Sequence, residues 1–455
     1  MRVYLRPFAP SLSPWMSRVL WLIALLIVPL VVGCGDASPG SSPTAFVAPT
    51  APPQPAPLSL YFSGFVSPQD TPNASAQRAL LALNASDGSL RWTYQAKGQV
   101  QFHPVLDHNM VYIGTADGNV DALDAASGKL RWKQFIGSGS PVVSVVTEGS
   151  VYGTRSPTPE YVPFGVPADG AVFALNTSDG TSRWTTSVTG AVLGVVDGVV
   201  YVGNAEQHTL FALRASDGAQ QWQFHASYPP EQIAVAEGQI FLLAADRTNS
   251  PVVASFTALN ESSGAPQWSY STQKAPGDIH LVGEEAGVVY LLTSVAQNES
   301  SLTSLVALDV RAGTLRWQTS PSPALSARLE SGVVYLGETN GIFEARAAAD
   351  GSLRWRIQTS GKDVGAPLLV ADGLLYTSSG GLTALSTTDG MVAWSYPSDV
   401  FVQVLAAMEG VLYAVTNATL TGQPGEDDVL AFQSRDGSAL WRYDAGYAQI
   451  FPVVG

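Results

Sequence analysis

Short apolar runs alternate with polar turns along most of the chain, and they fall into groups of four. One group contains residues 142–146, a Glu148-Gly149 turn and residues 151–153, followed by residues 171–175 and 182–184 on either side of an Asp179-Gly180 turn. An acidic residue followed by glycine between apolar runs is a strong hairpin signal, because glycine adopts the positive φ of tight turns. The pattern therefore predicts units of four antiparallel strands, with almost no helix.

A fixed spacing of three residue types marks each unit. Nine times, an alanine is followed six residues later by a glycine and four residues after that by a tryptophan, which uses nine of the 11 tryptophans. The nine are Trp92, Trp132, Trp184, Trp222, Trp268, Trp317, Trp355, Trp394 and Trp441. A repeat period of about 40 to 50 residues is typical of blades or solenoid turns.

The two ends of the repeat region each carry part of a unit. Residues 60–62 match the second strand of a unit and have no first strand before them, whereas residues 450–454 match a first strand with nothing after it. Pairing of these two segments would complete one blade and remove the free sheet edge of an open array. We therefore predict a single closed all-β propeller over residues 58–455, with nine blades by motif count.

The first 57 residues do not fit the repeat. Arg18 precedes an apolar stretch, residues 19–32, which is short for a membrane-spanning helix and suits a signal peptide. The stretch ends at Val31-Val32-Gly33-Cys34, which resembles the lipobox of bacterial lipoproteins, and Cys34 is the only cysteine. We predict a signal peptide over 1–33 and a lipid-modified Cys34; the alternative is a secretory peptide with a chance cysteine, and Met16 is an alternative start.

Residues 34–57 are rich in proline, alanine and serine, so we expect an extended tether between the lipid and the propeller. The formal net charge of the chain is −14. An acidic body repels a phosphate backbone, which argues against nucleic acid as a partner.

The repeat resembles a known family. Ala122, Asp124, Gly128 and Trp132, like their counterparts around Trp317, are similar to the tryptophan-docking repeat of quinoprotein (PQQ) propellers. The resemblance covers essentially all of residues 58–455. It implies that each tryptophan packs between neighbouring blades against a small residue such as alanine. It also implies eight blades, the family norm, against the nine that the motif count gives.

The catalytic members of that family hold PQQ over a calcium ion, use an acidic base and, in the alcohol dehydrogenases, usually add a vicinal disulfide. A single cysteine excludes the disulfide, and the five histidines form no HxH or HxxxH pair. The densest carboxylate group, Glu426-Asp427-Asp428, is a candidate calcium or binding loop, with a solvated acidic loop as the alternative. We predict no catalytic residue, metal or cofactor, and keep PQQ with calcium as the alternative.

Nearly all variation in unit length falls between the second and third strands of a unit. The variable segments are residues 63–79, 154–171, 246–255, 294–304 and 416–428. In a four-stranded blade these connections share one face of the disc, and insertions on one face often mark a binding surface. Phe65, Tyr161 and Phe164 lie in these segments and suit contact with a protein or polymer, although neutral drift of tolerant loops is the alternative.

These features together predict a non-catalytic, lipid-anchored scaffold on the extracytoplasmic side of a bacterial membrane, with a protein or cell-envelope component as partner. In anchor and repeat type the chain resembles the BamB family of outer-membrane assembly lipoproteins. The alternative function is a PQQ-dependent, quinoprotein-like dehydrogenase.

Overall fold

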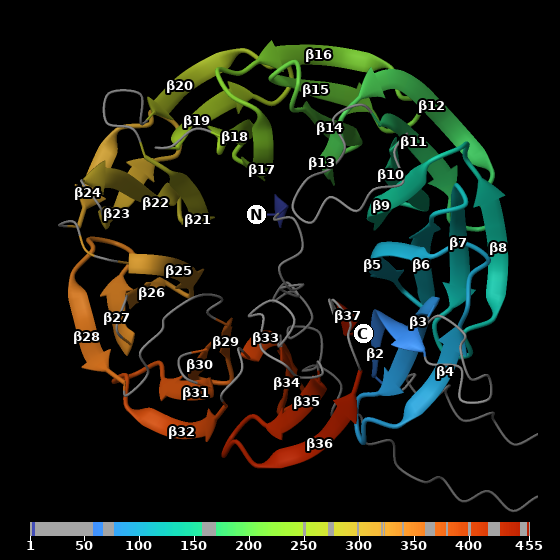
Figure 1. Ribbon diagram of the computed structural model, residues 1–455. Coiled ribbons are helices and arrows are strands. Elements are labelled where there is room, and N and C mark those ends of the chain that lie inside the picture. Colours follow the sequence, from blue (N-terminus) through green and yellow to red (C-terminus); the bar gives the residue numbers. More distant parts are fainter. Residues whose placement is uncertain are drawn as a thin grey trace, which may run out of the picture.

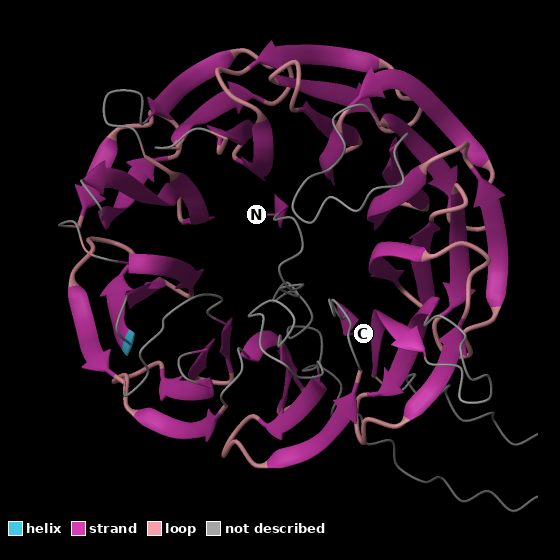
Figure 2. Cartoon of the chain, viewed as in Figure 1, coloured by secondary structure: helices cyan, strands magenta, loops and turns pink. Residues whose placement is uncertain are grey.

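The computed structural model describes residues 2–4, 58–66, 77–156, 170–248, 252–271, 277–297, 300–319, 322, 324–338, 341–359, 369–378, 381–398, 402–416, 428–445 and 453–454. These residues form nine antiparallel sheets arranged in a ring, with strands making up nearly all of the regular structure (Figures 1 and 2). The predicted all-β propeller is confirmed, and its blade number is nine, as the motif count predicts. The family norm of eight does not hold for this chain.

Each blade is a four-stranded meander that runs from an inner strand A to an outer strand D. Blade 1 contains β37 (Val453–Val454), β2 (Ser59–Val66), β3 (Gln77–Asn84) and β4 (Leu90–Tyr94); blade 2 contains β5 (Val100–Asp107), β6 (Met110–Thr115), β7 (Asn119–Asp124) and β8 (Leu130–Phe135); blade 3 contains β9 (Ser140–Thr147), β10 (Ser150–Ser156), β11 (Ala171–Asn176) and β12 (Ser182–Thr189). Blade 4 contains β13 (Ala191–Val196), β14 (Val199–Asn204), β15 (Thr209–Arg214) and β16 (Gln220–His225); blade 5 contains β17 (Pro230–Ala236), β18 (Gln239–Asp246), β19 (Val253–Asn260) and β20 (Pro266–Ser271); blade 6 contains β21 (Ile279–Glu285), β22 (Val288–Gln297), β23 (Ser300–Asp309) and β24 (Leu315–Gln318). Blade 7 contains β25 (Ala324–Glu330), β26 (Val333–Glu338), β27 (Ile342–Ala347) and β28 (Leu353–Gln358); blade 8 contains β29 (Leu369–Ala371), β30 (Leu374–Ser378), β31 (Gly381–Ser386) and β32 (Val392–Pro397); blade 9 contains β33 (Val402–Met408), β34 (Val411–Thr416), β35 (Asp428–Gln433) and β36 (Ala439–Asp444).

The ring closes through strands from the two ends of the repeat region. Strand β37 pairs with β2, with Leu60 opposite Val454 and Tyr61 opposite Val453, as the half-units predict. Between blades 9 and 1, the Trp441 indole N–H donates to the Ala85 carbonyl oxygen at 3.0 Å. A short strand β1 (Arg2–Tyr4) adds to the inner edge of blade 5 by pairing with β17, which places the N-terminus inside the ring (Figure 1).

The A–B hairpins owe their tightness to two consecutive residues with positive φ. In the turn between β13 and β14, Asp197 has φ 45° and Gly198 has φ 76°. Two positive φ values are typical of the type I′ turn, whose twist matches that of the flanking strands.

Each repeat tryptophan packs against the next blade, and a glycine receives it there. Trp222 of blade 4 is 7 % exposed and lies on Gly264 of blade 5, where an added Cβ would be 2.5 Å from the indole Cε3. Its indole N–H donates to the Glu261 carbonyl oxygen at 2.9 Å. The expected alanine is instead the cross-strand neighbour within the same blade, as Ala212 is opposite Trp222.

The same arrangement recurs at all nine seams, which explains why alanine, glycine and tryptophan keep a fixed spacing. The indole–glycine pairs are Trp92–Gly128, Trp132–Gly180, Trp184–Gly218, Trp222–Gly264, Trp268–Gly313, Trp317–Gly351, Trp355–Gly390, Trp394–Gly437 and Trp441–Gly88. An indole face lies directly on backbone here, so only a residue without a side chain fits.

Candidate functional site: the two faces of the ring

The meander divides the connections of each blade between two faces of the disc. The B–C connections and the D–A links lie on one face, which we call the loop face; the A–B and C–D turns lie on the other, the turn face. Several predicted site residues, Cys34, Tyr161, Phe164, Glu426 and Asp427, lie outside the described residues. Phe65 lies in β2 with its backbone opposite Arg78.

Asp428 is part of the blade rather than of the loop before it. It begins β35, its side chain is buried, and Arg442 Nε donates to its Oδ1 at 2.8 Å. Its backbone N–H donates to Thr416 Oγ1 at 2.7 Å. This carboxylate is therefore already paired and closes the loop-face end of blade 9.

A charged cluster on the loop face joins blades 5 and 6. Arg247 Nε donates to Glu231 Oε1 at 2.9 Å, and its NH1 group bonds the Asp278 carboxylate. His280 Nε2 lies 3.2 Å from the same carboxylate. Burial would raise the pKa of Asp278, but its bonds and charge interactions with His280 and Arg247 prevail and lower that pKa to about 2.

A second polar cluster lies within the seam between blades 1 and 2. The Tyr94 hydroxyl donates to Asp121 Oδ2 at 2.6 Å, and Lys133 Nζ lies 3.4 Å from the same oxygen. Asp121 is fully buried, and its Oδ1 has no hydrogen-bond partner among the described residues. Burial raises the pKa of Asp121, against the opposing effects of Tyr94 and Lys133.

Blade 7 carries a third set of buried carboxylates. Arg356 NH2 donates to Glu338 Oε2 at 2.9 Å, and Arg346 NH2 lies 2.7 Å from Glu344 Oε2. Both glutamates are almost fully buried, so their charges depend on these arginines. The hydrophobic pattern did not reveal these acids, because they stand among apolar neighbours in a strand.

The described residues contain no group of three or more His, Cys, Asp or Glu side chains that could hold a metal ion. Within the same part of the chain, no helix has the length and apolar character needed to cross a bilayer.

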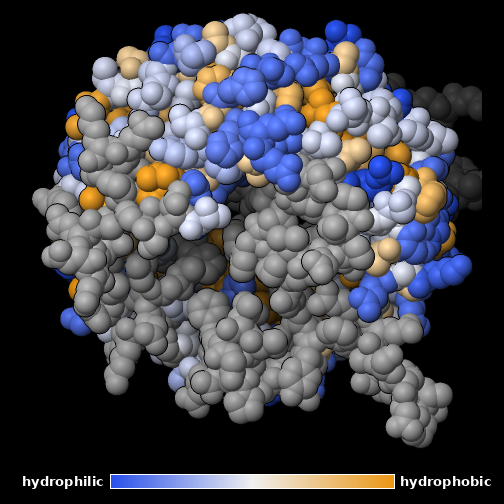
Figure 3. Space-filling model, turned by 45° about the horizontal axis from the view of Figure 1, so that its top comes forward, coloured by the Kyte–Doolittle hydropathy of each residue, from blue (hydrophilic) through white to orange (hydrophobic). Residues whose placement is uncertain are grey.

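The outer surface of the ring is mixed in character. Figure 3 shows hydrophobic residues in separate patches among hydrophilic ones. Among the described residues, the large exposed hydrophobic side chains are Leu90, Leu130, Phe135, Leu315, Leu353, Met391, Val392 and Leu440, and most stand at the start of an outer strand. Scattered exposed apolar residues of this kind are ordinary for a protein surface.

The turn face is acidic around the inner ends of blades 2 to 9. Every A–B hairpin within the described residues has a carboxylate in the turn or directly before it: Asp107, Glu148, Asp197, Glu237, Glu285, Glu330, Asp372 and Glu409. Repeated carboxylates of one sign create a negative potential that attracts basic groups and repels anions.

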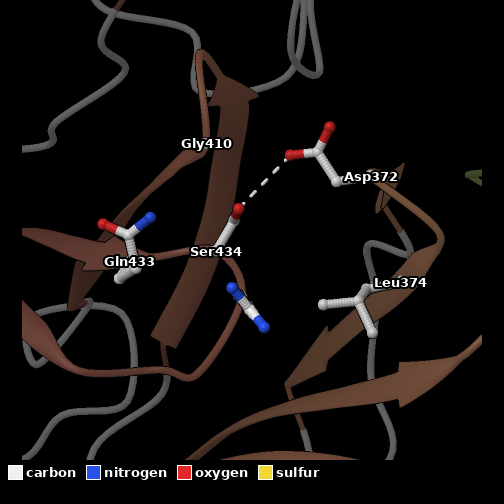
Figure 4. Close-up of a pocket in the computed structure, with 6 residues that line it drawn as sticks. Asp372, Leu374, Gly410, Gln433 and Ser434 are labelled. Atoms are coloured by element: carbon white, nitrogen blue, oxygen red, sulfur yellow. Dashed lines mark hydrogen bonds between the residues drawn. The ribbon is translucent and has the colours of Figure 1, made fainter.

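An open pocket interrupts the turn face at the seam between blades 8 and 9. Its cavity volume is about 490 Å³, and it is lined by Asp372, Leu374, Gly410, Gln433, Ser434 and Arg435 (Figure 4). Ser434 Oγ donates to Asp372 Oδ2 at 3.3 Å. The Ser434 carbonyl oxygen accepts from the Trp394 indole at 2.9 Å and from the Tyr376 hydroxyl at 3.3 Å, so the docked aromatic pair fixes the pocket floor.

A ring of four-stranded blades held by docked tryptophans defines the class as a propeller of the PQQ-repeat type. The family model for outer membrane protein assembly factor BamB matches residues 63–191, 168–324 and 303–450, and the chain belongs to this family.

Individual relatives share about a quarter of the aligned residues with this chain. BamB of Burkholderia pseudomallei is 26% identical over 305 residues, covering 64% of this chain and 75% of that protein. Polyvinylalcohol dehydrogenase of a Sphingopyxis species is 23% identical over 456 residues, covering 71% of this chain and 68% of that protein. The crystal structure of BamB from Moraxella catarrhalis is similar with 16% identity and a TM-score of 0.43, covering 69% of this chain and 92% of that one.

Proposed function

We propose that this protein is a lipid-anchored, non-catalytic scaffold that binds protein components of outer-membrane protein assembly on the extracytoplasmic side of the membrane. The family match over residues 63–450 carries the proposal, since the family is described as an outer-membrane assembly factor. Cys34 would supply the anchor, and residues 34–57 the spacer between the lipid and the ring.

The fold suits such a role because it presents loops on a rigid support. Nine tryptophans fix each blade to the next, so the positions of the loop-face connections are set by the ring. The length variation between units falls on that face, whereas the turns of the opposite face hardly vary. Loops on a rigid scaffold are common binding surfaces.

The Arg247 cluster and the Asp428–Arg442 pair support the same face. Both fix blade ends where the variable connections begin, and both pair their charges internally. They would hold the ends of the loops in place while the loops themselves contact the partner.

The experiment replaces residues 417–427 with a short Gly-Ser linker that leaves Asp428 and Thr416 intact. Full-length protein is solubilised from cross-linked cells of the source bacterium, and captured outer-membrane assembly proteins are identified by mass spectrometry. We expect the loop variant to capture less, whereas a matched variant with the same linker inserted at the Glu237-Gly238 turn, on the opposite face, keeps wild-type capture. Equal capture by both variants would count against the loop face as the contact surface.

A PQQ-dependent dehydrogenase is the second candidate, because a polyvinylalcohol dehydrogenase is among the relatives. The test is to add PQQ and calcium to the purified protein and to look for a bound-quinone absorbance band and for dye reduction with alcohols or sugars. Clear turnover would favour the enzyme over the scaffold.

A further inference from the structure

Two blade seams carry an arginine that the other seven lack. At the position two residues before the docking glycine, the C–D turns have arginine only in blade 6 and blade 9, as Arg311 and Arg435. In both cases the A–B turn of the preceding blade places a carboxylate opposite, Glu237 for Arg311 and Asp372 for Arg435. The two seams therefore share an arginine opposite a carboxylate.

In the seam between blades 5 and 6 the two side chains form an ion pair. Arg311 Nε donates to Glu237 Oε2 at 2.7 Å. The other oxygen of Glu237 lies 3.5 Å from where a Cβ of Gly287 would stand, so the glutamate also covers the neighbouring A–B turn. The two charges are therefore paired with each other.

In the seam between blades 8 and 9 the carboxylate is one methylene shorter and bonds a serine instead of the arginine. Asp372 bonds Ser434 at 3.3 Å, and the space beside Gly410, the counterpart of Gly287, is the pocket of Figure 4. Asp372 and Arg435 are both exposed and both line the pocket, and no ion pair joins them. The pocket thus presents a carboxylate and a guanidinium that can each take a partner from outside.

We propose that this pocket binds a polypeptide segment that carries one basic and one acidic side chain close together. The basic side chain would pair with Asp372 and would be favoured by the acidic turn face. The acidic side chain would pair with Arg435, whose planar guanidinium suits a carboxylate. Gln433 offers an amide that can donate to and accept from the peptide backbone, and a cavity of about 490 Å³ has room for two such side chains.

This site lies on the turn face, so it does not rest on the loop face proposed above. It would provide a second contact with a partner, or a contact with a different one. The bonds from Trp394 and Tyr376 to the Ser434 carbonyl oxygen hold this lining residue in place before binding, which reduces the cost of ordering the pocket.

The test measures binding of fluorescein-labelled Gly-Lys-Gly-Glu-Gly to the full chain by fluorescence anisotropy, beside peptides with Gln in place of Lys, of Glu or of both. We expect the Lys/Glu peptide to bind about three- to tenfold more tightly than either single-charge peptide, as partly exposed ion pairs allow. Equal binding of all four peptides would overturn the proposal.

Three variants locate the site. Arg435→Gln removes the guanidinium and should abolish the preference for Glu, whereas Arg311→Gln, at the matched position of blade 6, should leave binding unchanged. Asp372→Glu keeps the charge but has the side-chain length with which Glu237 bonds Arg311, so it should pair with Arg435 and also abolish binding. The site would be refuted if Arg435→Gln and Arg311→Gln weakened peptide binding equally, or if the Asp372→Glu variant bound the peptide as the wild type does. Far-UV circular dichroism confirms that each variant is folded.

Discussion

Two glycines of blade 5 allow the contribution of tryptophan docking to be measured. Gly264 has φ +69° and lies under Trp222, with the indole Cε3 2.5 Å from an added Cβ. Gly238 has φ +72° and would have nothing within 4 Å of an added Cβ. Alanine at either position bears the same backbone strain, so any difference between the two variants comes from the indole.

The expected magnitudes follow from these geometries. The left-handed backbone costs alanine about 1–2 kcal/mol, and Gly238→Ala should lose about that much unfolding free energy. Gly264→Ala should lose about 1–3 kcal/mol more, because the indole must move from a packed position. The upper bound on that extra loss is the cost of removing Trp222 altogether, about 3–5 kcal/mol.

Urea unfolding followed by far-UV circular dichroism measures both variants, and a third protein completes the cycle. In the Trp222→Ala background, Gly264→Ala should cost no more than Gly238→Ala, since the clash has gone. The reasoning would be refuted if Gly264→Ala and Gly238→Ala destabilised the wild-type protein equally.

Two further predictions concern charge and the anchor. Asp278→Asn should lower the unfolding free energy by about 2 kcal/mol at pH 6. Because the pKa of Asp278 is lowered to about 2, its contribution is complete above the ordinary aspartate pKa and is lost as the pH falls from about 4 to 2, so urea midpoints of variant and wild type should converge in that range; a constant gap down to pH 2 would contradict the pairing. Cys34→Ser should move the protein from the membrane fraction to the soluble fraction of fractionated cells, and unchanged membrane retention would exclude lipid attachment at that residue.

The fold was predictable because one spacing encodes a three-part contact. Trp222 packs on Gly264 of the next blade and stands opposite Ala212 in its own blade. The same three residue types recur in every unit, so the number of motifs equals the number of blades. The motif count predicts the correct number of nine blades, whereas the family norm of eight does not. The sequence could not show that glycine, and not alanine, receives the tryptophan of the neighbouring blade. Both residues are small, and only the geometry between blades distinguishes them.

The polar features were largely beyond reach of the sequence. Asp121 and Glu344 occupy strand positions that are apolar in most units, and their partners Tyr94 and Arg356 come from other strands. Glu237 bonds Arg311 whereas Asp372 bonds Ser434, and this difference becomes visible only when the opposing turns are placed in space. Asp428 stands beside two other acids in the sequence, yet the blade takes it up as a buried partner of Arg442.

The pairing of β2 with β37 has a consequence for how the molecule is made. Strand β2 is synthesised long before β37, with which it pairs. Blade 1 therefore cannot be completed while the chain is still emerging from the ribosome. Until then, Gly88 and the Ala85 carbonyl lack Trp441, and the inner edge of β2 is open to other strands. Loss of residues 453–454 would leave the ring without this closing pair.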